Sequence, residues 1–255
     1  MKIFVINLKR SSERRKLMAE QLEQLGLAYE FFDAIDGRTL SAQELHLKYN
    51  KVWARRHVGR DLSPGEIGCS LSHIGVYRQM VREQYPYALV LEDDARLFRE
   101  TPSILNAIGN VISSKQPVIC LLSECAGVNL EKSVYLTENY TMAPITTAAY
   151  LAHAYVITLE SAKRLGDILF PVVQVADDWS WHSRQTGIAL FACVPPLATT
   201  GLLEHIESTI ETAGVHRGEN IQERFKTWRW WKKKIHRKFW MKVDQFGLGY
   251  KFWRK

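Results

Sequence analysis

Three consecutive carboxylates, Glu92, Asp93 and Asp94, follow the apolar run of residues 87–91. A short β-prone run bounded by charge predicts a buried central strand of an α/β sheet, and ligands of such sheets bind beyond the carboxyl ends of the strands. On an extended backbone Glu92 and Asp94 would project to one side and Asp93 to the other. Two converging carboxylates with no basic residue before Arg96 suit Mg²⁺ or Mn²⁺. The alternative is a solvated junction between a strand and a loop.

A second pair of acids, Asp177 and Asp178, lies beside the tryptophans Trp179 and Trp181. Aromatic rings next to carboxylates suit a sugar, because the sugar ring packs on an aromatic face while its hydroxyls bond to the acids. The same residues are typical of a helix start, with an aspartate as the cap and the tryptophans in the core. The sequence leaves both interpretations open.

Positive charge gathers where the first predicted strand, residues 2–6, gives way to a helix. Ser11 or Ser12 is expected to cap this helix, which ends at Gly26. Backbone N–H groups and cationic side chains at a helix start can bind phosphate together. The cationic residues there are Lys9, Arg10, Arg14 and Arg15. Because no glycine-rich motif accompanies them, a solvated basic face is the alternative.

Two further polar positions fall where ligands are often bound. Asp33 follows the predicted second strand, residues 29–32, and an acid at this place contacts ribose or base in nucleotide-binding α/β folds. Residues 63–66, Ser-Pro-Gly-Glu, form a capping box that predicts a helix start. His73 lies on a polar stripe of that helix, where a histidine is either a functional group or a structural hydrogen-bonding group.

Alternating strands and helices position these residues. Further strands are expected over residues 117–122, 134–137, 146–158 and 188–194, and helices over residues 102–114 and 159–169, whereas residues 41–62 show no clear pattern. This alternation predicts an α/β domain over residues 1–215, with a mostly parallel central sheet flanked by helices.

Size and composition are those of a soluble globular protein. The 255 residues can bury a full core, and 46% are apolar and 24% charged. The four cysteines lack paired spacing, which indicates reduced core thiols of a cytoplasmic protein and no disulfide framework or zinc site. The apolar run at the N-terminus is too short for a signal peptide, and no stretch approaches the roughly 20 apolar residues of a membrane span.

The positive charge of the chain is concentrated in a C-terminal tail, residues 216–255. Residues 226–255 hold eleven Lys/Arg and one acid, so residues 1–225 carry 23 Lys/Arg against 26 Asp/Glu although the whole chain has a charge of +7. Apolar side chains recur on one helical face: Trp228, Trp231, Ile235, Phe239, Val243 and Phe246. A basic amphipathic helix of this kind binds an anionic membrane surface. The one-sided tryptophans favour a membrane over nucleic acid, and a partner helix is a third possibility.

Four motifs in order resemble glycosyltransferase family 25, which contains bacterial lipooligosaccharide galactosyltransferases. They are FVINL at residues 4–8 with Arg14 and Arg15, DAIDG at 33–37, LSPGEIGCSLSH at 62–73 and LEDDA at 91–95. Weaker similarity continues through residues 153–157 and 176–179. The resemblance implies a GT-A-like fold, a nucleotide-sugar donor that is usually UDP-galactose, a divalent metal, and inversion at the anomeric carbon.

The resemblance also assigns residues to the site. It maps the acidic metal motif onto residues 92–94, with Glu92 and Asp94 as metal ligands, and leaves open which acid contacts metal and which ribose. A further ligand could come from His205 or His216. The nucleotide-sugar site then comprises Asn7, Leu8, Arg10, Arg14, Asp33, Ser72, His73 and Asp93. Asp177 is expected to be the catalytic base, with Asp178 as the second candidate.

These observations predict a metal-dependent inverting glycosyltransferase that extends a lipid-linked oligosaccharide. Its expected cofactor is Mn²⁺ or Mg²⁺, its donor a UDP-sugar, and its acceptor a lipooligosaccharide or lipopolysaccharide sugar. We expect it to be cytoplasmic and peripheral on the inner face of the cytoplasmic membrane, without a nucleic-acid partner. The alternative is a non-catalytic, membrane-attached protein that binds a nucleotide or a glycan.

Overall fold

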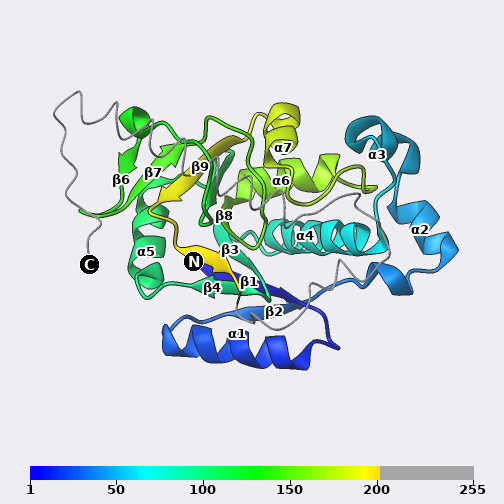
Figure 1. Cartoon of the computed structure of the whole chain (residues 1–255), viewed down its shortest axis with the longest axis horizontal. Coiled ribbons are helices and arrows are strands. Elements are labelled where there is room, and N and C mark those ends of the chain that lie inside the picture. The colour runs from blue at the N-terminus through cyan, green and yellow to red at the C-terminus, as the bar shows by residue number, and fades with distance from the viewer. Residues whose placement is uncertain (202–255) are drawn as a thin grey trace, which may run out of the picture. The chain divides into compact units, whose positions relative to one another are not determined.

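The computed structural model describes residues 1–201 and contains one large sheet of eight strands in the order β2-β1-β3-β8-β5-β9-β7-β6. Its strands are β1 (Lys2–Asn7), β2 (Glu30–Asp33), β3 (Tyr87–Glu92), β5 (Val118–Leu121), β6 (Val134–Tyr135), β7 (Thr141–Pro144), β8 (Ala154–Thr158) and β9 (Ala189–Val194). Only β8 and β7 run against the other six strands, as the pairings require. The predicted α/β fold with a mostly parallel sheet is therefore confirmed (Figure 1).

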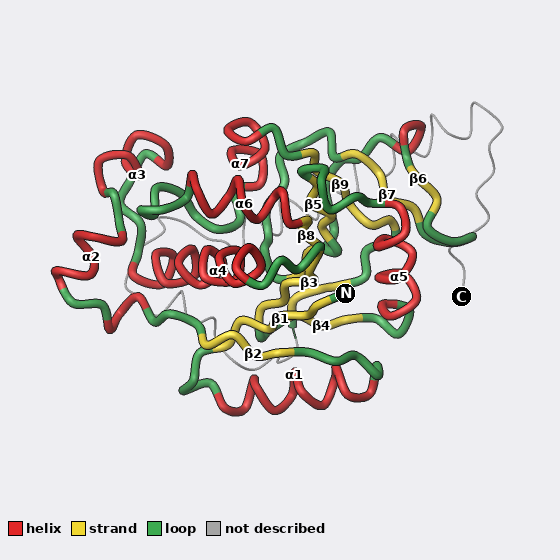
Figure 2. Tube along the Cα trace, turned by 180° about the vertical axis from the view of Figure 1, so that it is seen from behind, coloured by secondary structure: helices red, strands yellow, loops and turns green. Residues whose placement is uncertain are grey.

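Helices cover both faces of this sheet. They are α1 (Ser12–Gln24), α2 (Ala42–Lys48), α3 (Lys51–Val58), α4 (Pro64–Arg82), α5 (Thr101–Val111), α6 (Leu159–Ile168) and α7 (Trp179–Thr186), with short 3₁₀ turns at Gly37–Thr39 and Leu130–Lys132. Figure 2 shows α4 and α6 on one side of the central strands and α1 on the other. A small second sheet pairs β4 (Ala95–Leu97) with β10 (Ala198–Thr200).

Side-chain alternation along β1 divides the core into two layers. Phe4 and Ile6 pack in the cluster that contains the apolar residues of α4 and α6. Ile3 and Val5 pack in the opposite cluster, together with the apolar residues of α1 and α5. Helices cover both faces of the sheet, so no face of β1 is exposed to solvent. The side chains of β1 can therefore be apolar on both faces, and the strand is a continuous apolar run.

The polar segment before α4, which the sequence did not place, folds into two short helices. Ser41 and Glu44 form a capping box at the start of α2, and the Asn50 side chain accepts a hydrogen bond from the Trp53 amide at the start of α3. Gly59 ends α3 in the left-handed conformation, with φ of 80°. Residues 146–153 also differ from the prediction, since only Ala154–Thr158 of that β-prone stretch forms a strand.

The backbone of the loop that follows β2 packs directly against helix α4. Ser63 and Glu66 form the predicted capping box at its start. A Cβ atom on Gly68 would lie 2.5 Å from the backbone nitrogen of Gly37 and 2.5 Å from the carbonyl oxygen of Ile35. The hydroxyl of Ser72 accepts a hydrogen bond from the Ile35 amide at 2.8 Å. Only a glycine at position 68 lets the backbone of this loop rest on the helix.

Among residues 1–201, no helix is both long enough and apolar enough to span a bilayer. The predicted amphipathic tail and the candidate ligands His205 and His216 lie outside the described residues.

We predict that Gly68→Ala lowers the free energy of unfolding by about 1–3 kcal/mol, because the added methyl group overlaps backbone atoms that cannot move aside. Chemical denaturation measures the change. Gly166→Ala in α6 is the matched control, since its Cβ would meet no atom within 4 Å and should stabilise the helix by roughly 0.5–1 kcal/mol. Equal effects of the two substitutions would refute the proposed close approach.

Candidate functional site

A cleft opens at the carboxyl ends of the neighbouring parallel strands β1 and β3. Its walls come from the turn before α1, the loop after β2, the first turns of α4 and the acids that follow β3. Of the predicted site residues, Leu8, Arg10, Arg14, Ser72, His73, Glu92, Asp93 and Asp94 line it. The parallel register explains this meeting, because equivalent strand ends reach the same edge of the sheet.

Asp93 is held between two donors. The amide of Asn7 donates a hydrogen bond of 2.7 Å to its Oδ2, and Nη1 of Arg14 lies 3.1 Å from its Oδ1. Burial nevertheless raises the pKa of Asp93, since these donors offset the desolvation only in part. Asn7 and Arg14 thus belong to the site, and they act on this carboxylate.

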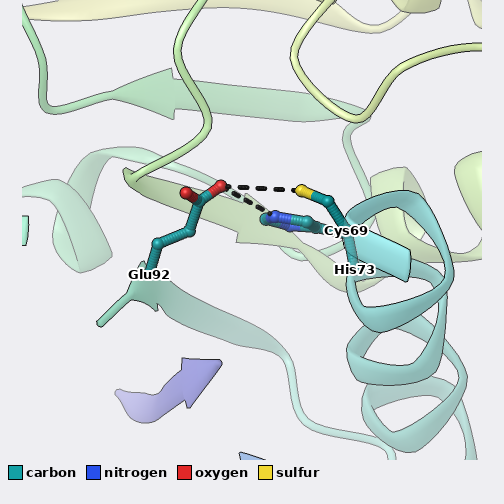
Figure 3. Close-up of side chains that lie close together, drawn as sticks. All are labelled: Cys69, His73 and Glu92. Atoms are coloured by element: carbon teal, nitrogen blue, oxygen red, sulfur yellow. Dashed lines mark hydrogen bonds and ion pairs between the residues drawn. The ribbon is translucent and has the colours of Figure 1, made fainter. Parts of the chain in front are cut away.

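Glu92 faces α4, where two side chains one turn apart point at the same oxygen (Figure 3). His73 Nε2 lies 3.2 Å and Cys69 Sγ 4.0 Å from Glu92 Oε1. Burial raises the pKa of Glu92, whereas the hydrogen bond and charge of His73 lower it. The lowering effects are together the larger, so the pKa of Glu92 is below its ordinary value. Glu92 contacts His73 and Asp93 contacts Asn7, so these two side chains have different partners, as the predicted alternation requires of them. The strand ends at Glu92, however, and all three acids line the one cleft.

Asp94 is the acid of this trio whose charge is least compensated. Its Oδ1 is buried and has no hydrogen-bond partner. Burial, together with the charges of Glu92 and Asp93, raises the pKa of Asp94 to about 7. An orphaned carboxylate oxygen beside a second carboxylate fits a hard divalent cation, which would supply the missing charge and coordinate the free oxygen. Glu92 and Asp94 are therefore suited to hold Mg²⁺ or Mn²⁺.

The predicted cluster of cations is divided among acids. Arg10 pairs with Asp36 in the cleft, whereas Lys9 and Arg15 both approach Asp33, at 3.1 and 3.7 Å. Asp33 lies at the carboxyl end of β2 as predicted, but it is outside the lining of the cleft. The Ser11 side chain makes no capping hydrogen bond. Arg10, Arg14 and Arg38 are the cations that line the cleft.

Asp177 is not among the residues that line the cleft, but its carboxyl group interacts electrostatically with Glu92 and Cys69, which do. Burial raises the pKa of Asp177 and the charge of Glu92 adds to the effect, while the amide of Leu151 opposes it. Leu151 has φ of 73°, a conformation that a branched side chain rarely adopts. Its carbonyl accepts a hydrogen bond from the Trp179 indole at 3.1 Å. Strained backbone held by surrounding contacts is frequent at functional sites, which supports a role for the loop beside Asp177.

Asp178 and the neighbouring tryptophans have structural roles. The Asp178 carboxylate accepts a hydrogen bond of 3.0 Å from the Trp181 amide and caps α7, as the alternative interpretation held. Trp179 and Trp181 are 0% and 8% exposed. The interpretation of these tryptophans as a sugar-stacking surface is therefore wrong, because an amphipathic core helix buries the rings that such a surface must expose.

Three ionisable residues of the cleft lining, Asp36, Arg38 and Cys69, are absent from the predicted site. Cys69 was interpreted as a core thiol, yet it lines the cleft, and Asp36 and Arg38 lie in the turn after β2. The spacing of Cys69 and His73, one helical turn apart on α4, is the signal that could have identified Cys69. Asp36 caps the 3₁₀ turn through the Arg38 amide, a local role that composition does not separate from ligand binding.

Comparison with known proteins gives consistent matches. A family model described as glycosyltransferase family 25 (LPS biosynthesis protein) matches residues 1–181. A glycosyltransferase 25 family member of Drosophila melanogaster is 33% identical over 171 residues, which are 64% of this chain and 27% of that protein. Procollagen galactosyltransferase 1 of Danio rerio is 28% identical over 244 residues, with 86% of this chain and 40% of that protein covered.

A third relative carries a different description. The probable inactive glycosyltransferase 25 family member 3 of Rattus norvegicus is 30% identical over 169 residues, which are 64% of this chain and 29% of that protein. The chain thus spans between 27% and 40% of the length of these three relatives.

We predict that Asp94→Asn stabilises the metal-free protein at alkaline pH. The folded state keeps the Asp94 proton up to pH of about 7, whereas the unfolded chain releases it near 3.8, so stability falls as pH rises between these values. In a chelator at pH 8 the variant should gain roughly 1–3 kcal/mol over the wild type, since one pKa unit is about 1.4 kcal/mol and partial exposure screens some of it. The gain should vanish near pH 4.

Denaturation at the two pH values with a chelator measures this difference. Asp167→Asn, which removes an exposed carboxylate of α6, is the matched control and should leave stability unchanged at both. Adding Mn²⁺ should stabilise the wild type more than Asp94→Asn. A pH-independent difference between Asp94→Asn and the wild type would contradict the uncompensated charge.

Proposed function

The chain belongs to glycosyltransferase family 25, and we propose that it transfers a sugar, galactose from UDP-galactose, to a hydroxyl group of an oligosaccharide acceptor. The observation that carries the proposal is the orphaned Asp94 carboxylate beside Glu92 at the carboxyl end of β3. The description of the zebrafish relative as a galactosyltransferase supports the choice of sugar.

The donor side of the proposal rests on charge. Departure of a nucleoside diphosphate leaves negative charge on two phosphates, and fixed positive charge must stabilise it. When bound by Glu92 and Asp94, Mn²⁺ or Mg²⁺ supplies that charge as a Lewis acid. Arg14 and Asn7 keep Asp93 in place beside these ligands, and Arg10 and Arg38 line the remaining wall.

The acceptor side needs a base. In an inverting transfer a carboxylate takes the proton of the acceptor hydroxyl as its oxygen attacks the anomeric carbon on the face opposite the leaving group. We assign this role to Asp177, because its carboxylate is near Glu92 while that of Asp178 is occupied in capping α7. A raised pKa strengthens Asp177 as a base, at the cost of protonation in mild acid.

The acceptor that we propose is a lipid-linked sugar. The family description as an LPS biosynthesis protein supports a lipooligosaccharide or lipopolysaccharide sugar. Such an acceptor is lipid-linked, and the basic, tryptophan-rich residues 216–255 have the composition of a segment that binds an anionic membrane surface. We therefore propose that the protein works at the inner face of the cytoplasmic membrane.

A second function remains in view because of the rat relative, which is described as probably inactive. In that case the cleft would bind a nucleotide sugar or a glycan without turnover. Binding of UDP-galactose with no glycosylated product over a panel of acceptors, and with at most slow release of UDP, would favour this function.

We predict that Asp177→Asn lowers the rate of transfer by about 10²–10⁴-fold, the usual contribution of a general base, while UDP binding is retained. A transfer assay with a soluble acceptor measures the rate, and calorimetry measures UDP binding. Asp178→Asn is the matched control, because asparagine also caps helices and should keep most of the activity. Equal losses in both variants, or parallel loss of UDP binding in Asp177→Asn, would reject Asp177 as the base.

For the tail, we predict that truncation after residue 224 leaves transfer to a soluble acceptor largely intact and reduces co-sedimentation with anionic liposomes. The physical reason is the loss of eleven Lys/Arg and the apolar face between them. Neutral liposomes control for contact that does not depend on charge. Unchanged sedimentation with anionic liposomes would contradict membrane binding by the tail.

A further inference from the structure

Cys69, His73 and Glu92 bring a sulfur, a nitrogen and an oxygen ligand atom within 4.8 Å of one another. Figure 3 shows both helix side chains directed at the same carboxylate. Helix α4 accounts for the first two, since residues four apart lie one above the other on one helix face. The end of β3 supplies the third.

This set of atoms differs in kind from the carboxylates that suit Mg²⁺. Thiolate and imidazole select softer cations such as Zn²⁺, which is bound by cysteine, histidine and glutamate, whereas Mg²⁺ prefers oxygen. At zinc bond lengths a tetrahedral site separates its ligand atoms by about 3.5 Å. His73 Nε2 and Cys69 Sγ lie 3.2 and 4.0 Å from Glu92 Oε1, so small side-chain rotations would close the site.

The surroundings of His73 already meet a requirement of histidine ligands. A metal-bound histidine donates its other ring N–H to a fixed partner, which sets its orientation. The Nδ1 atom of His73 lies 2.7 Å from the hydroxyl of Tyr155, which in turn lies 2.9 Å from the hydroxyl of Tyr77. All three side chains are at most 1% exposed, so the ring is held in position.

We propose that Cys69, His73 and Glu92 form a three-ligand site for a thiophilic divalent cation, and that Zn²⁺ is its physiological ligand. Binding releases two protons to solvent, the thiol proton of Cys69 and the Nε2 proton that His73 directs at Glu92. His73 then coordinates through Nε2 and keeps its Nδ1–H, which donates to the oxygen of Tyr155. All three ligands line the cleft, so a fourth position faces the space where a water or a phosphate oxygen can bind.

The site shares Glu92 with the proposed magnesium or manganese site. A cation on the sulfur side therefore removes one ligand from the cation between Glu92 and Asp94, and zinc would act as an inhibitor of transfer. This consequence rests on the proposed function, whereas the binding of Zn²⁺ itself does not.

The test uses Co²⁺ and Zn²⁺ on the full-length, reduced, chelator-treated protein without donor or acceptor. Co²⁺ should produce the near-ultraviolet absorption of a thiolate-to-cobalt charge transfer, and Zn²⁺ should abolish it. Cys69→Ser should lose this absorption and bind Zn²⁺ at least about tenfold more weakly by calorimetry. Cys125→Ser, which changes another half-buried thiol outside the cleft, should behave as the wild type.

Unchanged cobalt absorption and zinc affinity in Cys69→Ser would overturn the proposal. A second measurement covers the case in which Cys69→Ser does not fold. In the wild type, Zn²⁺ should slow alkylation of Cys69 several-fold and leave that of Cys125 unchanged, as followed by peptide mass spectrometry. Equal alkylation of Cys69 with and without Zn²⁺ would equally overturn it, whatever the outcome of the transfer assays.

Discussion

The repulsion among carboxylates that are partly withdrawn from water is the constraint around which the cleft is built. Ionising all three neighbouring acids at the end of β3 costs free energy, because their charges repel one another in a region of low dielectric. The charge of each acid is compensated differently. Asp93 has Asn7 and Arg14, Glu92 has His73, and Asp94 has an oxygen with no partner. A positively charged ligand would compensate the charge of Asp94.

The fold provides these partners because two parallel strands end at one place and one helix begins beside them. Strand β1 delivers Asn7 next to the end of β3, and the first turns of α4 carry Cys69 and His73. The loop after β2 closes the wall only because Gly37 and Gly68 allow its backbone to lie on α4. The shape of this wall thus depends on positions without side chains, which contribute no chemistry.

Sequence alone was sufficient where local rules decide the structure. The continuous apolar run before Glu92 predicted β3, and the capping box at Ser63 predicted the start of α4. Sequence was insufficient where the same residue type can serve either a local role, such as capping a helix, or a role in a site formed by tertiary contacts. An aspartate before Trp179 suits a cap and a base equally, and only the helix start in three dimensions separated Asp178 from Asp177. The spacing among the cysteines does not place Cys69 in the cleft. Its four-residue distance from His73 is the local signal, whereas its contact with Glu92 joins residues that are distant in sequence.

The pattern of pKa values argues for a ligand-binding cleft over a structural one. Burial raises the pKa of Asp93, Asp94 and Asp177, so the ionised form of each acid stabilises the fold less than its protonated form does. A purely structural role would be served better by asparagine, which donates and accepts hydrogen bonds without a charge to desolvate. Perturbed acids that gather in one cleft are the usual condition of sites that bind cations or move protons. The uncompensated negative charge therefore lowers folding stability at this edge of the sheet, and binding of the proposed cation would restore it.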